Sequence, residues 1–442
     1  RLVRQILAAD GADPATRPAA KFSLDREADP NLITRDVGRL FLGMDITCCQ
    51  CHDHPLIDGY KQSYYYGIYA FLNREVLITD PKDGAVIGEK AEGDVTFASV
   101  FKKKVSHKTG PRILDLKPLD EPNTPDAQGY LVPPNANSTV RPVPIYSRRA
   151  RLADSLTSGE VTPFSRNIAN RLWALMFGRG IVHPLDLHHD GNPPSNPELL
   201  DLLAREFTAM QYDVKAFLRE LALTRAYRRS SEPPPGTESE PLDPGLFAVA
   251  SVRALSPEQL SWSVMQGLGI RASYESLAIR QLDGVDPRMR AILASDARRR
   301  ALRTSMIEEE VTRQLEGYVA QFISLFGGVA GQPQAAAEAG STVDQALYIL
   351  NGGTIRSWTS AGSSWLPGTL AHVTDPSAVA DGLYLNLLSR RPTAEERAEA
   401  VEYLAERTRN LAKGQDPAKE RAAAIADLTW SLVASSEFRF NH

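Results

Sequence analysis

Apolar residues recur at helical spacing through the first part of the chain. The stretch 34–48 predicts a helix, with Thr34 in the position of an N-cap. Its apolar face consists of Val37, Leu40, Phe41 and Met44. A second helix is predicted over 63–75, where the sequence "SYYYGIYAFLNRE" is rich in aromatic residues. Residues 1–75 therefore form a predicted helical domain.

The pattern changes over residues 76–146, where short β-branched runs alternate with turn residues. The runs "EVLITDPKDGAVIGEK", "DVTFASVFKKKV" and "GPRILDLKPL" predict short strands. A Pro-rich connector follows, and it precedes a return to helical spacing at Ser147. This middle segment is interpreted as a β-rich insert with a connector.

Residues 147–442 predict a helical C-terminal domain. One helix is expected to end at Gly178, because the apolar spacing of "RNIANRLWALMFG" stops there. Three pairs have the spacing of a capping box: Ser195 with Glu198, Ser256 with Gln259, and Thr393 with Glu396. The predicted fold is mainly α, with the β-rich insert between two helical domains.

Composition narrows the class of protein. The chain has 442 residues, 43% of them hydrophobic, and a formal net charge of -4. We therefore expect a globular protein of two or three domains that does not bind nucleic acid. No apolar run approaches the length of a transmembrane helix. Because the chain starts at Arg1 and lacks a signal-peptide pattern, we expect the full protein to begin earlier.

All three cysteines lie in the segment "DITCCQCHDHP". Cys48, Cys51 and His52 match the C-x-x-C-H pattern by which c-type haem is attached. Two thiols three residues apart can reach one edge of a porphyrin, and the adjacent histidine then ligates the iron. The segment predicts one covalently bound haem, with His52 as the proximal iron ligand.

Other interpretations of the segment remain open. Cys48, Cys51, His52 and His54 could form a tight zinc site, although such sites usually draw on a second pair of ligands elsewhere. A redox-active pair of thiols is a further alternative, but no thioredoxin-like pattern surrounds it. The thiols could also serve only as small apolar side chains in a core.

A haem iron needs a second axial ligand or an open position. The loop "VHPLDLHHDG" offers His183, His188 and His189, and Met44 is a further candidate because thioethers ligate iron in many cytochromes. His54 is too close to His52 in sequence to reach the opposite face, so it is expected to support the site or contact the cofactor.

The segment "RLFLGMDITCCQCHDHPLIDGYKQSYYYGIYAFL" resembles the C-A-Q-C-H-[DN]-H-P segment of a large group of planctomycete proteins of unknown function. These proteins carry a second uncharacterised domain, which "NRLWALMFGRGIVHPLDLHHDGNPPSNPELLDLLA" is similar to. Later landmarks follow in the same order, among them "LTRAYRRSS", "LYLNLLSRRPTAEE" and "DLTWSLVASSEF". The resemblance covers nearly the whole chain.

This resemblance points to Cys48, Cys51, His52, His54 and Pro55 as the motif residues. It implies export to the periplasm, cell envelope or exterior, and partnership with cytochrome or other haem-bearing domains. The chain departs from the pattern at Cys49, where the family usually has alanine, and in the histidine-rich loop at 183–189.

The sequence therefore predicts an exported electron-transfer protein with one haem c, which self-associates or has a haem-bearing partner. Two alternatives belong to other classes. One is a metal-dependent enzyme acting on complex carbohydrate, and the other is a haem-free interaction module. No nucleotide-binding or hydrolase motif accompanies the cysteine segment.

Overall fold

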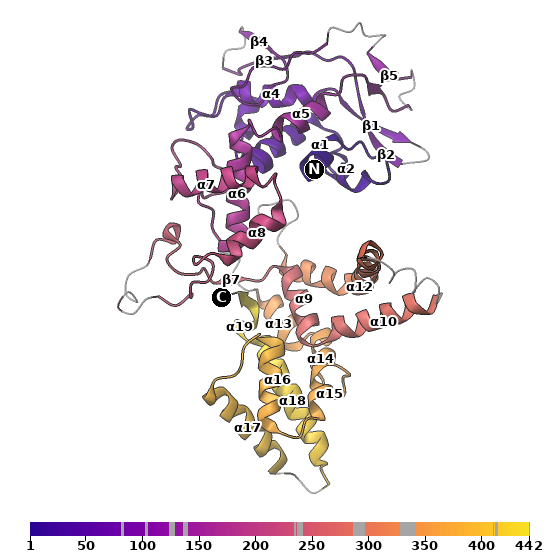
Figure 1. Ribbon diagram of the computed structural model, residues 1–442, viewed down its shortest axis with the longest axis vertical. Coiled ribbons are helices and arrows are strands. Elements are labelled where there is room, and N and C mark those ends of the chain that lie inside the picture. The colour runs from indigo at the N-terminus through magenta and orange to yellow at the C-terminus, as the bar shows by residue number, and fades with distance from the viewer. Residues whose placement is uncertain are drawn as a thin grey trace. The chain divides into compact units, whose positions relative to one another are not determined.

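The computed structural model describes residues 1–80, 84–101, 105–122, 129–135, 140–233, 236, 242–285, 297–327, 342–409, 411 and 414–441. It consists of two compact units, Arg1–Ser251 and Val252–His442, called here the first and second unit. Both are mainly helical, and small antiparallel sheets lie in the first unit, so the predicted fold class is confirmed (Figure 1). The predicted domain ranges 1–75, 76–146 and 147–442 stay a prediction.

The helices that the structure describes in the first unit are of two kinds. The α-helices are α1 (Leu2–Ala8), α2 (Arg17–Leu24), α3 (Pro30–Asp36), α4 (Gln62–Leu72), α5 (Arg148–Leu156), α6 (Thr162–Phe177), α7 (Pro197–Ala209) and α8 (Val214–Leu223). The short non-α helices are the π-helix η1 (Val37–Phe41) and the 3-10 helices η2 (Thr47–Gln50) and η4 (Pro244–Leu246).

Between α4 and α5, the described residues form three two-stranded sheets. They pair β1 (Glu75–Asp80) with β2 (Gly84–Glu89), β3 (Val95–Ala98) with β4 (Ser106–Thr109), and β5 (Tyr130–Val132) with β6 (Val143–Pro144). The run at 110–119 is not a strand, contrary to prediction, and Leu114 there has a φ of 52°. Parts of the Pro-rich connector, 123–128 and 136–139, lie outside the described residues.

The first predicted helix begins earlier and ends earlier than expected. Asp29 is its N-cap, since its side chain accepts hydrogen bonds from the backbone amides of Asn31 and Leu32. Thr34 lies inside the helix, where its hydroxyl donates to the carbonyl of Pro30. Met44 lies beyond the helix, in an extended pairing with Leu187. The predicted capping box at Ser195 is also wrong, because Asn196 is the N-cap of α7.

One hydrophobic core joins the N-terminal helices to α5 and α6. Cys49, Tyr65 and Phe71 are fully buried in the same cluster as Leu152 and Phe164. The chain segments before and after the sheets therefore share a single apolar core. A neighbouring cluster packs α6 against α7 and α8. Residues far apart in sequence thus stabilise the cysteine segment.

A buried ion cluster ties the β1–β2 hairpin to the start of α5. Glu75 and Glu89 face each other across the hairpin. Glu89 accepts hydrogen bonds from the Ser147 hydroxyl at 2.5 Å and from the Arg148 amide at 2.6 Å. The Nε of Arg149 lies 2.9 Å from Oε1 of Glu75, and the two side chains are 3% and 1% exposed. Burial raises the pKa of Glu75 to about 7, although Arg149 opposes this rise.

Within its described residues, the second unit is helical apart from one short strand pair. Its helices are α9 (Pro257–Gly267), α10 (Ile270–Val285), α12 (Ala297–Phe326), α13 (Val343–Asn351), α14 (Gly353–Thr359), α15 (Leu366–Ala371), α16 (Pro376–Leu387), α17 (Ala394–Arg409), α18 (Pro417–Ala434) and α19 (Ser436–Arg439). Strand β7 (Arg253–Ala254) pairs with β8 (Phe440–Asn441).

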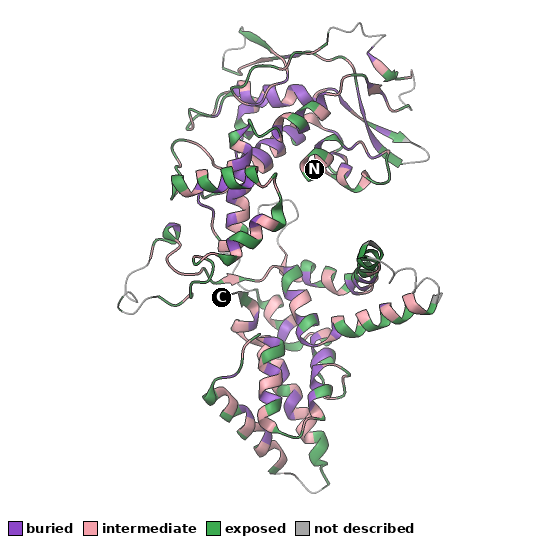
Figure 2. Cartoon of the chain, in the orientation of Figure 1, coloured by how far each residue is buried: buried purple, intermediate pink, exposed green. Residues whose placement is uncertain are grey.

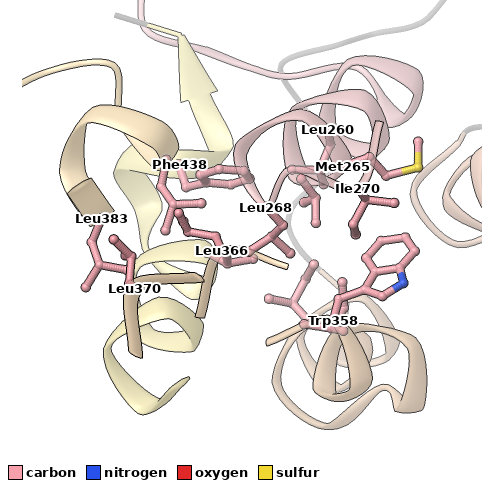
Figure 3. Close-up of a cluster of buried hydrophobic side chains, with 14 of the residues drawn as sticks. Leu260, Met265, Leu268, Ile270, Trp358, Leu366, Leu370, Leu383 and Phe438 are labelled. Carbon is pink, nitrogen blue, oxygen red and sulfur yellow. The ribbon is translucent and has the colours of Figure 1, made fainter. Parts of the chain in front are cut away.

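Apolar faces of these helices meet in one core. In Figure 3, Leu260, Met265 and Leu268 from the α9 region lie in one cluster with Trp358 and Leu366. Figure 2 shows buried positions together with exposed ones along helices such as α16 and α18.

Two predicted capping boxes in the second unit are confirmed. Ser256 and Gln259 make the reciprocal hydrogen bonds at the start of α9. Thr393 and Glu396 do the same at α17, at 2.7 and 3.2 Å. The predicted helix end at Gly178 in the first unit is also confirmed, because this glycine caps α6 with a φ of 84°.

No helix in the described part of the chain has both the length and the apolar character that crossing a membrane requires.

Candidate functional site

The three cysteines occupy one tight turn but differ in exposure. Cys48 and Cys51 are exposed, whereas Cys49 is fully buried. Helix η2 and the following residue turn the backbone so that Cys49 points into the core of the first unit. Burial, followed by the nearby Cys48 and Asp53, raises the pKa of the Cys49 thiol to about 12. The turn therefore separates the two motif thiols from the third one.

Among the described residues, only one ring nitrogen of His52 has a hydrogen-bond partner. Its Nδ1 donates a hydrogen bond to the backbone carbonyl of Asp53 at 2.6 Å, which fixes the tautomer. In the neutral ring, Nε2 then carries the lone pair and can ligate a metal ion. The ring of Phe101 lies 5.1 Å from the imidazole, centroid to centroid. His52 thus has the protonation pattern that an iron ligand needs.

His54 has the opposite pattern. Its Nδ1 accepts hydrogen bonds from the backbone amides of Leu56 and Ile57, at 3.2 and 3.1 Å. In the neutral ring, the proton therefore lies on Nε2, where it blocks metal ligation. The amide of His54 donates to the carbonyl of Tyr60. These bonds account for His54 as a residue that shapes the loop, and its predicted contact with a cofactor stays a prediction.

The predicted histidine loop packs directly on the cysteine segment. The amide of Asp45 donates to the carbonyl of Asp186 at 2.9 Å, and the amide of His188 donates to the carbonyl of Gly43 at 3.0 Å. Between these bonds, Met44 pairs with Leu187 as an isolated antiparallel bridge. Two loops far apart in the sequence therefore form a short extended pairing just before Cys48.

Gly43 makes this pairing possible. Its φ is 71°, in the left-handed region that favours glycine. A Cβ atom there would lie 2.7 Å from Oδ1 of Asn167 and 2.7 Å from Cδ2 of His188. The backbone of the cysteine segment thus approaches helix α6 and the histidine loop too closely for any side chain.

Polar residues on the buried face of α6 hold both loops. The amide group of Asn170 donates to the carbonyl of Val182 at 2.9 Å and to Nε2 of His188 at 3.3 Å. Its oxygen accepts from the amide of Val182 at 3.0 Å. Asn167 donates to the carbonyl of Leu40, and Arg171 pairs with Asp186. One turn and a half of α6 therefore fixes the histidine loop and the entry to the cysteine turn.

Three of the four predicted distal ligands are engaged elsewhere in the structure. Met44 is 7% exposed and belongs to the hydrophobic core. His188 accepts the bond from Asn170, and His189 accepts a bond at Nδ1 from the amide of Gly191 at 3.2 Å. His183 is exposed. The histidine loop is next to the motif, as expected, but a distal role for any of these residues stays a prediction.

The side chains of the motif do not form a closed metal site. Among the residues that the structure describes, no group of three or more His, Cys, Asp or Glu side chains is arranged to hold a metal ion. The interpretation of Cys48, Cys51, His52 and His54 as a four-ligand zinc site therefore has no preformed arrangement behind it.

Two residues of the site, Phe101 and Asn170, were not predicted from the sequence. The β3–β4 hairpin reaches the motif, because the amide of Val100 donates to the carbonyl of Cys51 at 3.0 Å and places Phe101 beside His52. The only sequence signal for Phe101 is that it is a bulky apolar residue within a basic stretch. Asn170 had a better signal, since an amide on the apolar face of a predicted helix needs a partner.

His188 predicts a pH dependence of stability. Burial, with Arg166 and Arg171 nearby, lowers its pKa from the ordinary 6.5 to about 4. The unfolded chain then binds the proton more readily, so the contribution of His188 to stability falls as the pH drops from 6.5 to 4, by on the order of 3 kcal/mol. His188→Gln, which keeps an acceptor for Asn170, is expected to remove this fall.

Urea denaturation at pH 7 and pH 4.5 checks this prediction. The buried Glu75 acts in the opposite direction in both proteins, so the test is the difference between them: between the two pH values, the stability of the wild-type protein is expected to change less favourably than that of the variant. Equal changes in both proteins would contradict the role of His188.

Two family models match the chain. The first is PSD1, a protein of unknown function (DUF1553), over residues 148–404, and the second is PSCyt2, a protein of unknown function (DUF1549), over residues 2–76. Comparison with curated proteins and with solved structures found no match. The first model covers more than half of the chain, and the second ends just after the cysteine segment and helix α4. These two matches confirm the resemblance noted above: the chain belongs to the PSD1 family.

Proposed function

We propose that this protein carries one covalently attached c-type haem and transfers electrons through it. The observation that carries the proposal is the sorting of three adjacent cysteines by the fold. Cys48 and Cys51, which have the spacing of an attachment pair, are exposed, and Cys49 is withdrawn into the core. The burial of the third thiol supports Cys48 and Cys51 as the two sulfurs that would form the thioether bonds.

The donor set fits this group. Cys48 and Cys51 would hold the porphyrin, and His52 would bind the iron through Nε2, since its Nδ1 is bonded to Asp53. Phe101, which is 77% exposed, provides an apolar ring beside the imidazole. When bound, the haem supplies a one-electron couple between ferric and ferrous iron. The protein's own residues then anchor the group and limit its contact with water.

The proposal includes a setting for the protein. Covalent haem attachment takes place outside the cytoplasm, so we propose a periplasmic, envelope or extracellular location. Electron transfer through one haem requires a second redox centre nearby. We therefore propose a haem-bearing partner domain or self-association, within a larger assembly. The match to PSCyt2, a family of unknown function, is compatible with such partners.

Haem content tests the proposal. The full chain, produced in a host that attaches c-type haem, is expected to show a sharp reduced α-band and to retain its haem after denaturation in alkaline pyridine. The Cys48→Ala/Cys51→Ala double variant is expected to lose covalent haem, because both attachment sulfurs are gone. Cys49→Ala is the matched control and is expected to keep full loading, since alanine replaces a sulfur that faces the core.

A colourless wild-type protein would overturn the proposal. Stoichiometric zinc or iron without a haem spectrum would direct attention to a metal-dependent enzyme, and a protein without metal or chromophore to an interaction module. Loss of haem from Cys49→Ala alone, in a protein that still folds, would show that the wrong pair of sulfurs was assigned.

A further inference from the structure

One face of helix α12 lies in the core of the second unit, where the helix contacts α9 and α10 (Figure 1). The helix has 30 residues and is therefore about 45 Å long. Its core face carries apolar residues that are at most 8% exposed: Ile307, Val311, Leu315 and Phe322. The opposite face is exposed along the helix. Helix α12 thus presents a long surface to solvent.

The exposed face carries a stripe of residues with the spacing of a coiled coil. Steps of three and four residues alternate over eight exposed positions, called here the outer stripe: Arg299, Leu302, Met306, Glu309, Arg313, Glu316, Ala320 and Ile323. This spacing keeps the side chains on one line of the helix and is the spacing by which two helices pair. The outer stripe therefore has the periodicity of a helix–helix interface.

The composition of the outer stripe distinguishes it from an ordinary solvated face. Leu302, Met306 and Ile323 are 55%, 40% and 41% exposed. Helix α17 offers a comparison within the same unit, since its described residues include no exposed large apolar side chain. A helix face that stays in water is normally polar throughout. Apolar residues at both ends of the outer stripe, with charged residues between them, instead suggest a surface that another helix covers.

The order of residues along the outer stripe matches a second copy of itself in the antiparallel direction. When two copies are centred at the level of Val311, residues equally far before and after it face each other. Glu309 then faces Arg313 of the second copy, and Arg313 faces Glu309 of that copy. Leu302 faces Ala320, so a large side chain meets a small one. Both central pairs join opposite charges.

The other pairs and the opposite direction agree with this arrangement. Met306 faces Glu316, and Arg299 faces Ile323, so that a long charged side chain lies along an apolar one with its charged end toward water. A parallel pair would instead place Glu309, Arg313 and Glu316 each against its own copy. Like charges would then meet at three successive positions, which disfavours that direction.

Arg313 is already held in place within its own helix. Its Nε donates to Oε2 of Glu310 at 2.9 Å, and its side chain is 68% exposed. A guanidinium that is fixed before association loses less conformational freedom when it meets a second carboxylate. Arg313 can therefore pair with Glu310 of its own chain and with Glu309 of the second copy.

We propose that two copies of this chain associate through the outer stripes of α12, antiparallel, about a two-fold axis at the level of Val311. Each copy supplies the same surface, so the assembly closes at two chains. The central Glu309–Arg313 pairs fix direction and register, as polar residues do inside coiled coils, and the apolar ends exclude water. The inference does not rest on the proposed function, because α12 belongs to the second unit and the cysteine motif to the first.

Sedimentation of the full chain over a range of concentrations tests the dimer. A reductant is present, so that the exposed cysteines do not join chains. The wild-type chain is expected to dimerise. Glu309→Arg and Arg313→Glu are each expected to raise the Kd of the dimer at least about tenfold, because either change makes both central pairs repulsive. Glu308→Arg is the matched control, since Glu308 is exposed but lies off the outer stripe, and its Kd is expected to stay unchanged.

Mixing the two single variants tests the contact between chains directly. In an equimolar mixture of Glu309→Arg and Arg313→Glu, each central pair of a mixed dimer again joins opposite charges. The mixture is therefore expected to recover the dimer that neither variant forms alone. Ion pairs within each helix stay broken in the mixture, so a change in helix stability cannot produce this recovery. Circular dichroism confirms that each variant folds.

Four results would overturn the proposal. They are a monomeric wild-type chain, a dimer that neither charge reversal weakens, an equimolar mixture that stays monomeric, and a Glu308→Arg control that dissociates as readily as the other two variants. Haem content enters none of these outcomes, so the proposed function and this inference stand or fall separately.

Discussion

Arg149→Ala is expected to lower the free energy of unfolding of the first unit by about 3–5 kcal/mol at pH 8. Arg149 is the ion-pair partner of Glu75, and both side chains are almost completely buried. Removing the guanidinium leaves a carboxyl group in the interior without its ion-pair partner, opposite Glu89, which raises the pKa of Glu75. The lost arginine also donates to the carbonyl of Ala9, so the variant loosens the contact of α5 with the N-terminal helices.

The pH dependence of this loss has a definite sign. The pKa of Glu75 is already about 7, and Arg149 is the chief influence that keeps it from rising further. Without the arginine, Glu75 takes up a proton at higher pH and becomes neutral. At pH 5 the buried group is uncharged, so the loss is expected to be smaller than at pH 8.

Urea denaturation at both pH values, with hydrogen exchange in β1, β2 and α5, measures the effect. Arg151→Ala is the matched control, since Arg151 lies on the same helix with its side chain 54% exposed. The control is expected to cost less than about 1 kcal/mol. Equal losses in the two variants would contradict the importance of the buried pair.

Gly43→Ala is expected to cost about 3 kcal/mol. A left-handed conformation costs a non-glycine residue about 1–2 kcal/mol, and forced overpacking adds about 1–3 kcal/mol. Both apply here, because the added Cβ would meet Asn167 and His188 at 2.7 Å. Relief of the clash requires the histidine loop to move away from the cysteine segment.

Two measurements check the effect of this variant. The first is the urea midpoint, and the second is the rate at which Cys49 is labelled under native conditions, which is expected to rise. Gly59→Ala is the control, since Gly59 lies in the same segment and an added Cβ would meet nothing within 4 Å. Unchanged labelling of Cys49 in a destabilised Gly43→Ala protein would show that the loop pairing does not protect the thiol.

The elements of the fold were more predictable than their contacts. Helix α9 and its capping box at Ser256 follow from local chemistry, because an N-cap and its partner lie three residues apart. The start of α3 at Asp29 was missed, since Thr34 has the same capping chemistry five residues later and local sequence cannot choose between them. Its early end depends on the pairing of Met44 with Leu187, which is set by tertiary contacts.

The candidate site shows the same division. The sequence indicated Cys48, Cys51 and His52 from spacing alone. It could not indicate that Cys49 turns inward, because the core that buries Cys49 also includes residues of α5 and α6, among them Leu152 and Phe164. Nor could it distinguish the histidines, whose tautomers are set by backbone groups that only the folded loops bring within reach.

The shared core has a consequence for the order of events during synthesis. A growing chain emerges from its N-terminus, so the cysteines appear well before α5, α6 and the histidine loop. Until Leu152 and Phe164 have arrived, part of the core that encloses Cys49 does not exist. A thiol reagent that acts before the core forms therefore has access to all three cysteine sulfurs, whereas one that acts later has access to Cys48 and Cys51. Whether a reagent can distinguish Cys49 from Cys48 and Cys51 therefore depends on whether it acts before or after this core has formed.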